Sequence, residues 1–213
     1  MIEPSMLATY IASRICHDLI SPVASVNSAL ELLDDTTDPE MQAQAEQLLV
    51  SGAEAATARL QLLRYAFGSA GLSDSAADRH EVKTIIESFM STHKPNVEWD
   101  IQTEHFSCSH ARVLMNMVIL AAGSIPRGGT VHLKVANQGD ALNLTATAIG
   151  PRAKVSDYTI SIFNERLPDE GWSARTIQPL FTRMVVDELG GEIECTSEAE
   201  TVTYRAINLR GKG

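Results

Sequence analysis

Residues 14–22 read Arg14-Ile15-Cys16-His17-Asp18-Leu19-Ile20-Ser21-Pro22, and this stretch lies inside a long helical pattern. Apolar side chains recur at helical spacing, within about 40° of one face if each residue turns the helix by about 100°. They are Ala12, Ile15, Leu19, Val26, Leu30 and Leu33. His17 falls about 160° away from that stripe, so its imidazole is predicted to face water. The pattern predicts an amphipathic helix with a histidine on its polar side.

A second amphipathic helix follows after a short break. The segment Asp34-Asp35-Thr36-Thr37-Asp38-Pro39 contains turn and capping residues and ends the first helix near Leu33. Asp38 is placed to cap the second helix, with Pro39 at its first position, and apolar residues then recur until Phe67. Two long amphipathic helices with a short connection form an antiparallel hairpin, whose apolar stripe is only half covered. We therefore expect two chains to pair as a homodimer that forms a four-helix bundle.

Helices and strands are mixed in the rest of the chain. The small, polar segment 68–77 predicts a linker or surface loop, which divides the chain into a hairpin domain, 1–70, and a second domain, 71–213. The patterning there predicts helices at 81–92, 109–124, 156–164 and about 173–190, and strands at 97–101, 130–136, 142–148, 192–197 and 202–209. The whole is typical of the α+β class, with a two-layer α/β sandwich as the second domain.

The composition limits the kinds of partner. With 17 basic and 27 acidic side chains the net charge is −10, which argues against nonspecific binding to nucleic acid or to an anionic membrane. No apolar run approaches the roughly 20 residues of a membrane helix, and the N-terminus lacks the basic start of a signal peptide. Three widely spaced cysteines, Cys16, Cys108 and Cys195, are expected to be reduced and mostly buried. We expect a soluble, cytoplasmic protein that binds neither nucleic acid nor membranes.

Side chains near the middle of the first helix suggest phosphoryl-transfer chemistry. A neutral histidine nitrogen is a nucleophile near neutral pH, provided that the other ring nitrogen keeps its proton. Asp18 can accept a hydrogen bond from that N–H and stabilise positive charge on His17. Arg14 and Ser21 lie one turn to either side, close enough to hydrogen-bond a phosphoryl oxygen or a water molecule. Pro22 cannot donate to the carbonyl of Asp18, so we expect the helix to be bent or loosened one turn beyond the histidine.

A second interpretation competes with this one. Most exposed helix histidines are inert, and the other five histidines are interpreted in that way: His80, His93, His105, His110 and His132. Pro22 favours a functional role for His17, because a proline inside a helix costs about 3 kcal/mol or more and the apolar pattern does not require one. The alternative is that Pro22 is a simple packing kink.

The segment His17-Asp18-Leu19-Ile20-Ser21-Pro22 resembles the H-box of histidine kinases. The hairpin resembles the dimerisation and phosphotransfer domain of these kinases, and the remainder resembles their ATP-binding domain in outline. Asn116 begins a segment similar to the N-box helix, and Gly150-Pro151 stands where the first glycine box belongs. Glu188-Leu189-Gly190-Gly191 matches the end of the helix after the second glycine box.

Residues that bind nucleotide in the kinases are replaced in this sequence. The N-box asparagine that helps to hold Mg²⁺ is Leu120, the acidic residue at the adenine is Ala148, and the second glycine of the first box is Arg152. Thr176-Ile177-Gln178-Pro179 stands where glycines would cradle the phosphates. Phosphates are bound by exposed backbone N–H groups and by metal ions, and proline and bulky side chains remove that option. We therefore expect that the chain does not bind ATP.

An intact phosphohistidine motif beside a degraded nucleotide site resembles the ChpT-type histidine phosphotransferases of alphaproteobacterial phosphorelays. This resemblance implies an enzyme that moves a phosphoryl group between receiver-domain aspartates through His17, as a homodimer with a role in cell-cycle control. The implied partners are the receiver domains of a hybrid histidine kinase and of response regulators. The chain is expected to hold no cofactor of its own, with Mg²⁺ bound by the receiver. Two alternatives stay open: a divergent histidine kinase that uses ATP through unusual contacts, and a non-catalytic scaffold that docks receivers through the hairpin.

Overall fold

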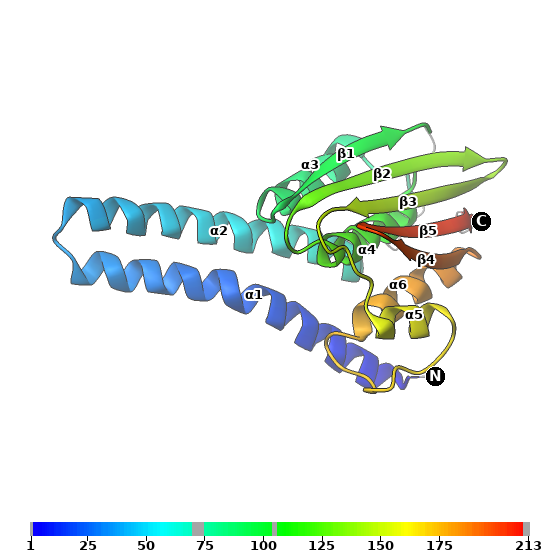
Figure 1. Cartoon of the computed structure of the whole chain (residues 1–213), viewed down its shortest axis with the longest axis horizontal. Helices are drawn as coiled ribbons and strands as arrows, with labels where there is room; N and C mark the ends of the chain where they lie inside the picture. Colours follow the sequence, from blue (N-terminus) through cyan, green and yellow to red (C-terminus); the bar gives the residue numbers. More distant parts are fainter. Residues whose placement is uncertain (1, 70–74, 104–105, 211–213) are drawn as a thin grey trace.

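The computed structural model describes residues 2–69, 75–103 and 106–210. Two long helices come first, α1 (Pro4–Asp35) and α2 (Pro39–Phe67), and they extend as an antiparallel hairpin from the rest of the molecule (Figure 1). Asp38 caps α2, its carboxylate accepting the backbone N–H of Glu40 at 2.9 Å. The predicted helical hairpin is confirmed. The predicted domain boundary at residues 70 and 71 lies outside the described residues, as does His105.

The remaining described residues, 75–210, are called the α/β region. Its helices are α3 (Arg79–Ser91), α4 (Cys108–Ser124), α5 (Asp157–Phe163) and α6 (Ile177–Glu188). Its strands are β1 (Pro95–Ile101), β2 (Gly129–Gln138), β3 (Ala141–Ile149), β4 (Glu192–Glu198) and β5 (Thr201–Leu209). They form one mixed sheet in the order β1-β2-β3-β5-β4, in which β1 and β2 are parallel and the other neighbours are antiparallel. The predicted α+β class is confirmed.

Helices cover one face of this sheet. On β2, Val131, Leu133 and Val135 are buried, whereas His132 and Lys134 between them are exposed. Because successive strand residues point to opposite faces, this alternation gives the sheet one apolar and one polar face. α3, α4 and α6 pack against the apolar face (Figure 1). The core of the molecule therefore lies between the sheet and these helices.

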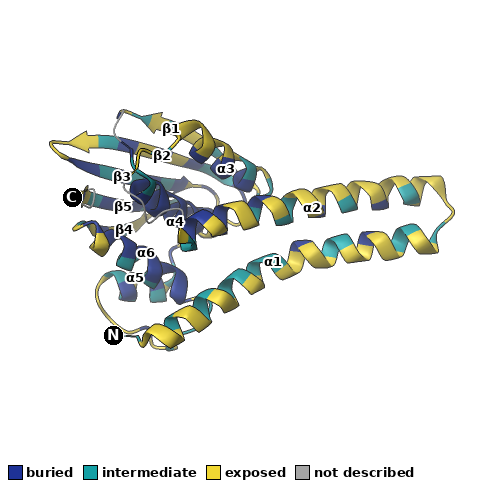
Figure 2. Cartoon of the chain, turned by 180° about the vertical axis from the view of Figure 1, so that it is seen from behind, coloured by how far each residue is buried: buried dark blue, intermediate teal, exposed yellow. Residues whose placement is uncertain are grey.

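The hairpin is much less buried than the α/β region (Figure 2). Only Pro22 and Ala29 of α1 are buried. The predicted apolar stripe is half covered in the single chain: Leu19 and Val26 are half-buried, and Leu30 is exposed. Across the described residues, no helix is both long and apolar enough to span a membrane.

The start of α6 differs from the sequence prediction. The helix begins at Ile177 and not near Ser173. The Thr176 hydroxyl accepts the backbone N–H of Ser173 at 2.8 Å and donates to the carbonyl of Gly171 at 3.1 Å. These side-chain hydrogen bonds compete with the first helical turn, so residues 174–176 form a turn instead.

The burial of cysteines and histidines also differs from the expectation. Cys16 is exposed, and Cys108 and Cys195 are half-buried, so the prediction of mostly buried thiols is wrong. His110 is buried and its side chain completes the capping box at the start of α4, and His93 is half-buried. The packing of neighbouring elements decides the burial of such side chains, and a local pattern does not show it.

Candidate functional site

His17 lies on the exposed side of α1, with 66% of its side chain accessible to solvent. Its Nδ1 lies 3.1 Å from Oδ1 of Asp18. A carboxylate oxygen only accepts hydrogen bonds, so this contact places the ring proton on Nδ1 and leaves the lone pair of Nε2 free. Nε2 is therefore the ring atom that can act as a nucleophile.

Arg14 contacts the other oxygen of the same carboxylate. Its Nε lies 2.9 Å from Oδ2 of Asp18, one helical turn away, and both side chains are only 20% exposed. The sequence predicts that Arg14 meets a phosphoryl oxygen or a water molecule, whereas the structure shows it paired with Asp18. The carboxylate is thus held between a guanidinium and the imidazole of His17.

Ser21 lies one turn beyond His17 and is exposed. Its backbone carbonyl accepts the hydroxyl of Ser25 at 3.2 Å. Within the described residues no hydrogen bond joins Ser21 to His17, Asp18 or Arg14. The structure therefore brings three of the four predicted site residues together and leaves Ser21 at the edge of the group.

Pro22 changes the hydrogen bonding of α1 at Asp18. A proline has no N–H, so the Asp18 carbonyl lacks its donor within the helix. Arg59 of α2 supplies one instead, with Nη1 donating to this oxygen at 2.8 Å. Pro22 also packs closely on α2, since a Cβ at Gly52 would lie 3.2 Å from the Pro22 carbonyl oxygen. The proline thus has a packing role and, in addition, frees a carbonyl beside the histidine.

Sequence reasoning missed two arginines near the site. Arg59 is 41 residues from Asp18 along the chain. The sequence indicates its role only indirectly, because Pro22 leaves the Asp18 carbonyl in need of a donor from another part of the chain. Arg175, just before α6, lines a surface hollow together with Arg14 and His17. No sequence signal points to Arg175, because it reaches this hollow only when α6 packs beside α1.

A second hollow, of about 390 Å³, lies between the hairpin and the α/β region. The charged or titratable residues that line it are Arg14, Asp18, Arg59, His93 and Lys94. Burial lowers the pKa of His93, and the nearby charge of Arg59 lowers it further. The contact of Nδ1 with the Phe89 carbonyl at 2.8 Å acts in the opposite direction and raises the pKa. The positive charge of the hollow therefore comes mainly from the two arginines and the lysine.

The positions that resemble a nucleotide site form a packed polar network. Asn116 of α4 is fully buried, and its Nδ2 donates to the carbonyls of Ala66 at 3.1 Å and Arg112 at 2.8 Å. Its Oδ1 accepts Nε2 of Gln178 at 2.9 Å. A side chain from the segment that replaces the second glycine box thus engages the amide oxygen of Asn116.

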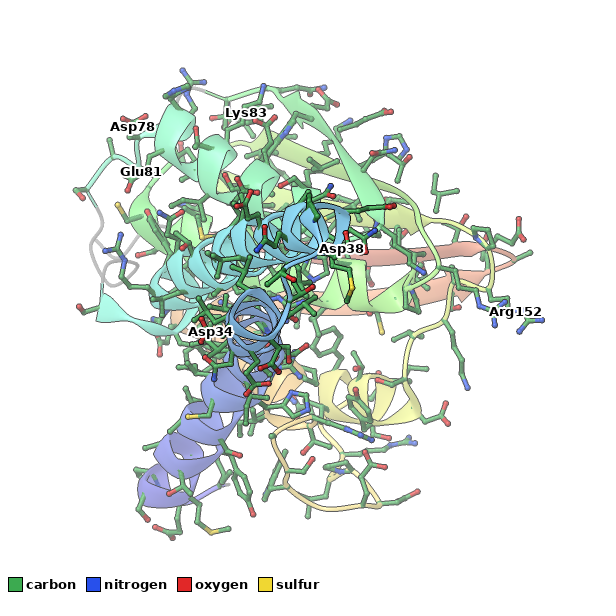
Figure 3. All side chains as sticks on the ribbon, turned by 90° about the vertical axis from the view of Figure 1, so that its left-hand side faces the viewer. Asp34, Asp38, Asp78, Glu81, Lys83 and Arg152 are labelled. Carbon is green, nitrogen blue, oxygen red and sulfur yellow. The ribbon has the colours of Figure 1, made fainter. Side chains whose placement is uncertain are left out.

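Arg152 occupies the exposed turn after β3. It adopts a φ of 60°, a conformation that glycine accepts more readily than other residues. Figure 3 shows Arg152 at the outer edge of the molecule, well to the side of the hairpin end that carries Asp34 and Asp38. This turn keeps a glycine-like backbone although its residue carries a long side chain.

Comparisons with known proteins decide the family. The family model of the histidine phosphotransferase C-terminal domain matches residues 79–201. The chain is also 30% identical over 200 residues to the protein phosphotransferase ChpT of Brucella abortus (strain 2308), with 94% of each chain covered. The chain belongs to the histidine phosphotransferase family. A bacterial phosphotransferase structure determined at 1.7 Å superposes on this histidine phosphotransferase with a TM-score of 0.86 at 28% identity, over 97% of this chain and 98% of that one.

These comparisons confirm the predicted family and the predicted phosphotransferase activity in a phosphorelay. The matched residues 79–201 belong to the α/β region of this histidine phosphotransferase. The group formed by His17, Asp18 and Arg14 lies on α1, outside the residues that the family model covers. Its geometry is therefore an observation independent of that match.

Proposed function

We propose that His17 carries the phosphoryl group between receiver-domain aspartates and that the chain does so without ATP. The observation that carries this proposal is the arrangement on α1. An exposed imidazole has its Nδ1 on the carboxylate of Asp18, and Arg14 holds that carboxylate from the other side. This is the arrangement that a histidine needs if a visiting protein is to reach its Nε2.

In the proposed step, Nε2 of His17 attacks the phosphorus of a receiver's aspartyl phosphate. The N–P bond forms while the bond between phosphorus and the aspartyl oxygen breaks, and the receiver's carboxylate leaves. The proton stays on Nδ1, and Asp18 stabilises the positive charge of the ring. A second receiver collects the group by the reverse step. Such transfer depends mainly on positioning and charge neutralisation, to which the receiver contributes Mg²⁺.

The buried hydrogen bond between Asn116 and Gln178 supports the part of the proposal that excludes ATP and a resident cofactor. An amide oxygen that already accepts a buried hydrogen bond is a poor metal ligand unless the network rearranges. Titration calorimetry with Mg-ATP is therefore expected to show no heat of binding. Measurable binding would favour the divergent kinase instead.

Exposed apolar side chains on the hairpin support a homodimer. The large ones are Met6, Ile20, Val23, Leu30, Met41, Leu48, Val50 and Leu60. A second hairpin would cover such a surface by forming a four-helix bundle. The location that we propose is the cytoplasm, where the free cysteines would stay reduced.

Incubation with a radiolabelled phospho-receiver tests the proposal. The wild-type protein is expected to take up the label, and His17→Ala is expected to take up none. His80→Ala, at an exposed histidine of α3, is the matched control and should label as the wild type does. Label on His17→Ala would contradict the proposal, and a protein that binds receivers but is never labelled would be a scaffold.

The role of Asp18 has a test of its own. Asp18→Asn keeps the shape of the side chain but removes the charge that stabilises the ring. Transfer is expected to slow by about 100-fold, with the oligomeric state unchanged in light scattering. An unchanged rate would show that Asp18 does not orient or stabilise His17.

A further inference from the structure

Arg59 is a charged side chain beside the site whose role the proposed reaction leaves unexplained. Its Nη1 donates to the backbone carbonyl of Asp18 at 2.8 Å, from the neighbouring helix. A hydrogen bond from a guanidinium is charge-assisted and stronger than one between neutral groups. It replaces the helical hydrogen bond that Pro22 cannot make. The turn of α1 that carries the histidine is therefore tied to α2 as well as to its own helix.

Part of the Arg59 guanidinium lacks a hydrogen-bond partner. The residue is half-buried, its Nε is buried without a hydrogen-bond partner, and within the described part of the chain it forms no salt bridge. Burying a charge without a carboxylate partner costs free energy. A methionine would fill a similar space without that cost. The charge and the donors of Arg59 thus call for an explanation other than packing.

We propose that Arg59 is a positioning residue for phosphotransfer, which holds the backbone of Asp18 so that Oδ1 stays on Nδ1 of His17. This proposal rests on the proposed function of His17. Arg59 holds the backbone carbonyl of Asp18, and Arg14 holds its Oδ2 at 2.9 Å. The remaining contact of Asp18, between Oδ1 and Nδ1 of His17, is therefore constrained from two sides. The close approach of the two helices at Gly52 keeps Arg59 within reach of the freed carbonyl.

Transfer kinetics of two Arg59 variants test the proposal. Arg59→Met keeps the length of the side chain and removes its donors, and the transfer rate at saturating phospho-receiver is expected to fall about 10- to 100-fold. The receiver concentration at half-maximal rate should stay nearly unchanged, because Arg59 does not touch the receiver in this account. Arg59→Lys, which retains a charged donor, should recover most of the rate. Arg64→Met, at an exposed arginine of the same helix, is the matched control and should transfer as the wild type does.

The ¹⁵N spectrum of the His17 ring separates positioning from folding. The wild type is expected to show the Nδ1–H tautomer, and Arg59→Met a mixture of both tautomers. A variant with unchanged rate and tautomer would overturn the proposal. The proposal would also be overturned if Arg59→Met were less stable to heat but kept the Nδ1–H tautomer of His17, and if Arg59→Lys did not recover the transfer rate. If the wild type itself takes no phosphate on His17, the proposed function fails, yet the tautomer comparison still decides whether Arg59 positions the ring.

Discussion

The hairpin and the α/β region differ most in the fraction of their residues that is buried. α1 buries only Pro22 and Ala29, whereas α4 buries 14 of its 17 residues (Figure 2). The α/β region therefore holds most of the core, to which the end of α2 adds Leu62, Leu63, Tyr65 and Ala66, while the rest of the hairpin keeps apolar surface uncovered. The proposed chemistry lies on the less buried part, which fits a histidine that has to be reached by another protein. The two regions should therefore respond to different substitutions.

Placing charges on the apolar surface of the hairpin is expected to have the largest effect. Leu30→Glu combined with Leu48→Glu removes four leucines from the proposed dimer, two in each chain, and each contributes about 1.5–3 kcal/mol when buried. The Kd of this dimer should therefore rise by more than about 1,000-fold. Light scattering would then report the mass of a single chain. Ile160→Glu, at an exposed apolar residue of α5, is the control and should leave the dimer intact. A wild type that is already monomeric would contradict the account of the hairpin.

The core of the α/β region offers the next largest effect. Asn116→Ala leaves Nε2 of Gln178 without its acceptor and leaves the carbonyl of Ala66 with Nε of Arg112 as its remaining side-chain donor. The free energy of unfolding is expected to fall by about 2–3 kcal/mol, measured by chemical denaturation. Asn96→Ala, on the exposed side of β1, should change it by less than about 0.5 kcal/mol. Equal stability of the two variants would show that the buried network does not support this region.

Two helix glycines, Gly52 of α2 and Gly123 of α4, differ in the space around them. At Gly52 a Cβ would lie 3.1 Å from Cγ2 of Val26, whereas at Gly123 nothing lies within 4 Å. Gly123→Ala should raise the free energy of unfolding by about 0.5–1 kcal/mol, because alanine is the better helix former. Gly52→Ala should lower it by about 1 kcal/mol, since crowding of the α1–α2 contact outweighs that gain. Thermal unfolding measures both, and stabilisation by Gly52→Ala would contradict the close helix contact.

The smallest effect is a pH dependence at the junction of the two regions. Burial holds the pKa of His93 below its ordinary value of 6.5. The unfolded chain then binds more protons in the window between the lowered pKa and about 6.5, so the free energy of unfolding decreases as the pH falls through that window. Above about 6.5 this contribution is fully present. His93→Gln should flatten this part of the profile, and His80→Gln should not; identical slopes in both variants would exclude His93 as the cause.

Local features of the molecule could be predicted from the sequence. The helix period and the break at residues 34–39 predict the hairpin, and the adjacency of His17 and Asp18 predicts their contact. Contacts between residues far apart in the chain could not be predicted in this way. Arg59 reaches Asp18 across 41 residues, and no periodic pattern specifies which donor will serve a freed carbonyl. The start of α6 was mispredicted because hydroxyl groups of Ser173 and Thr176 form a turn where the apolar pattern suggests a helix.

If Nε2 of His17 carries the phosphoryl group as we propose, the position of the phosphate on the labelled protein will show it. After incubation with a phospho-receiver, mass spectrometry at alkaline pH would identify the modified residue, and ³¹P–¹⁵N correlation would identify the ring nitrogen. We expect one phosphohistidine, at His17, with phosphorus on Nε2, because Nδ1 faces Asp18 at 3.1 Å. Phosphate on Nδ1 of His17, or on any other residue, would contradict it.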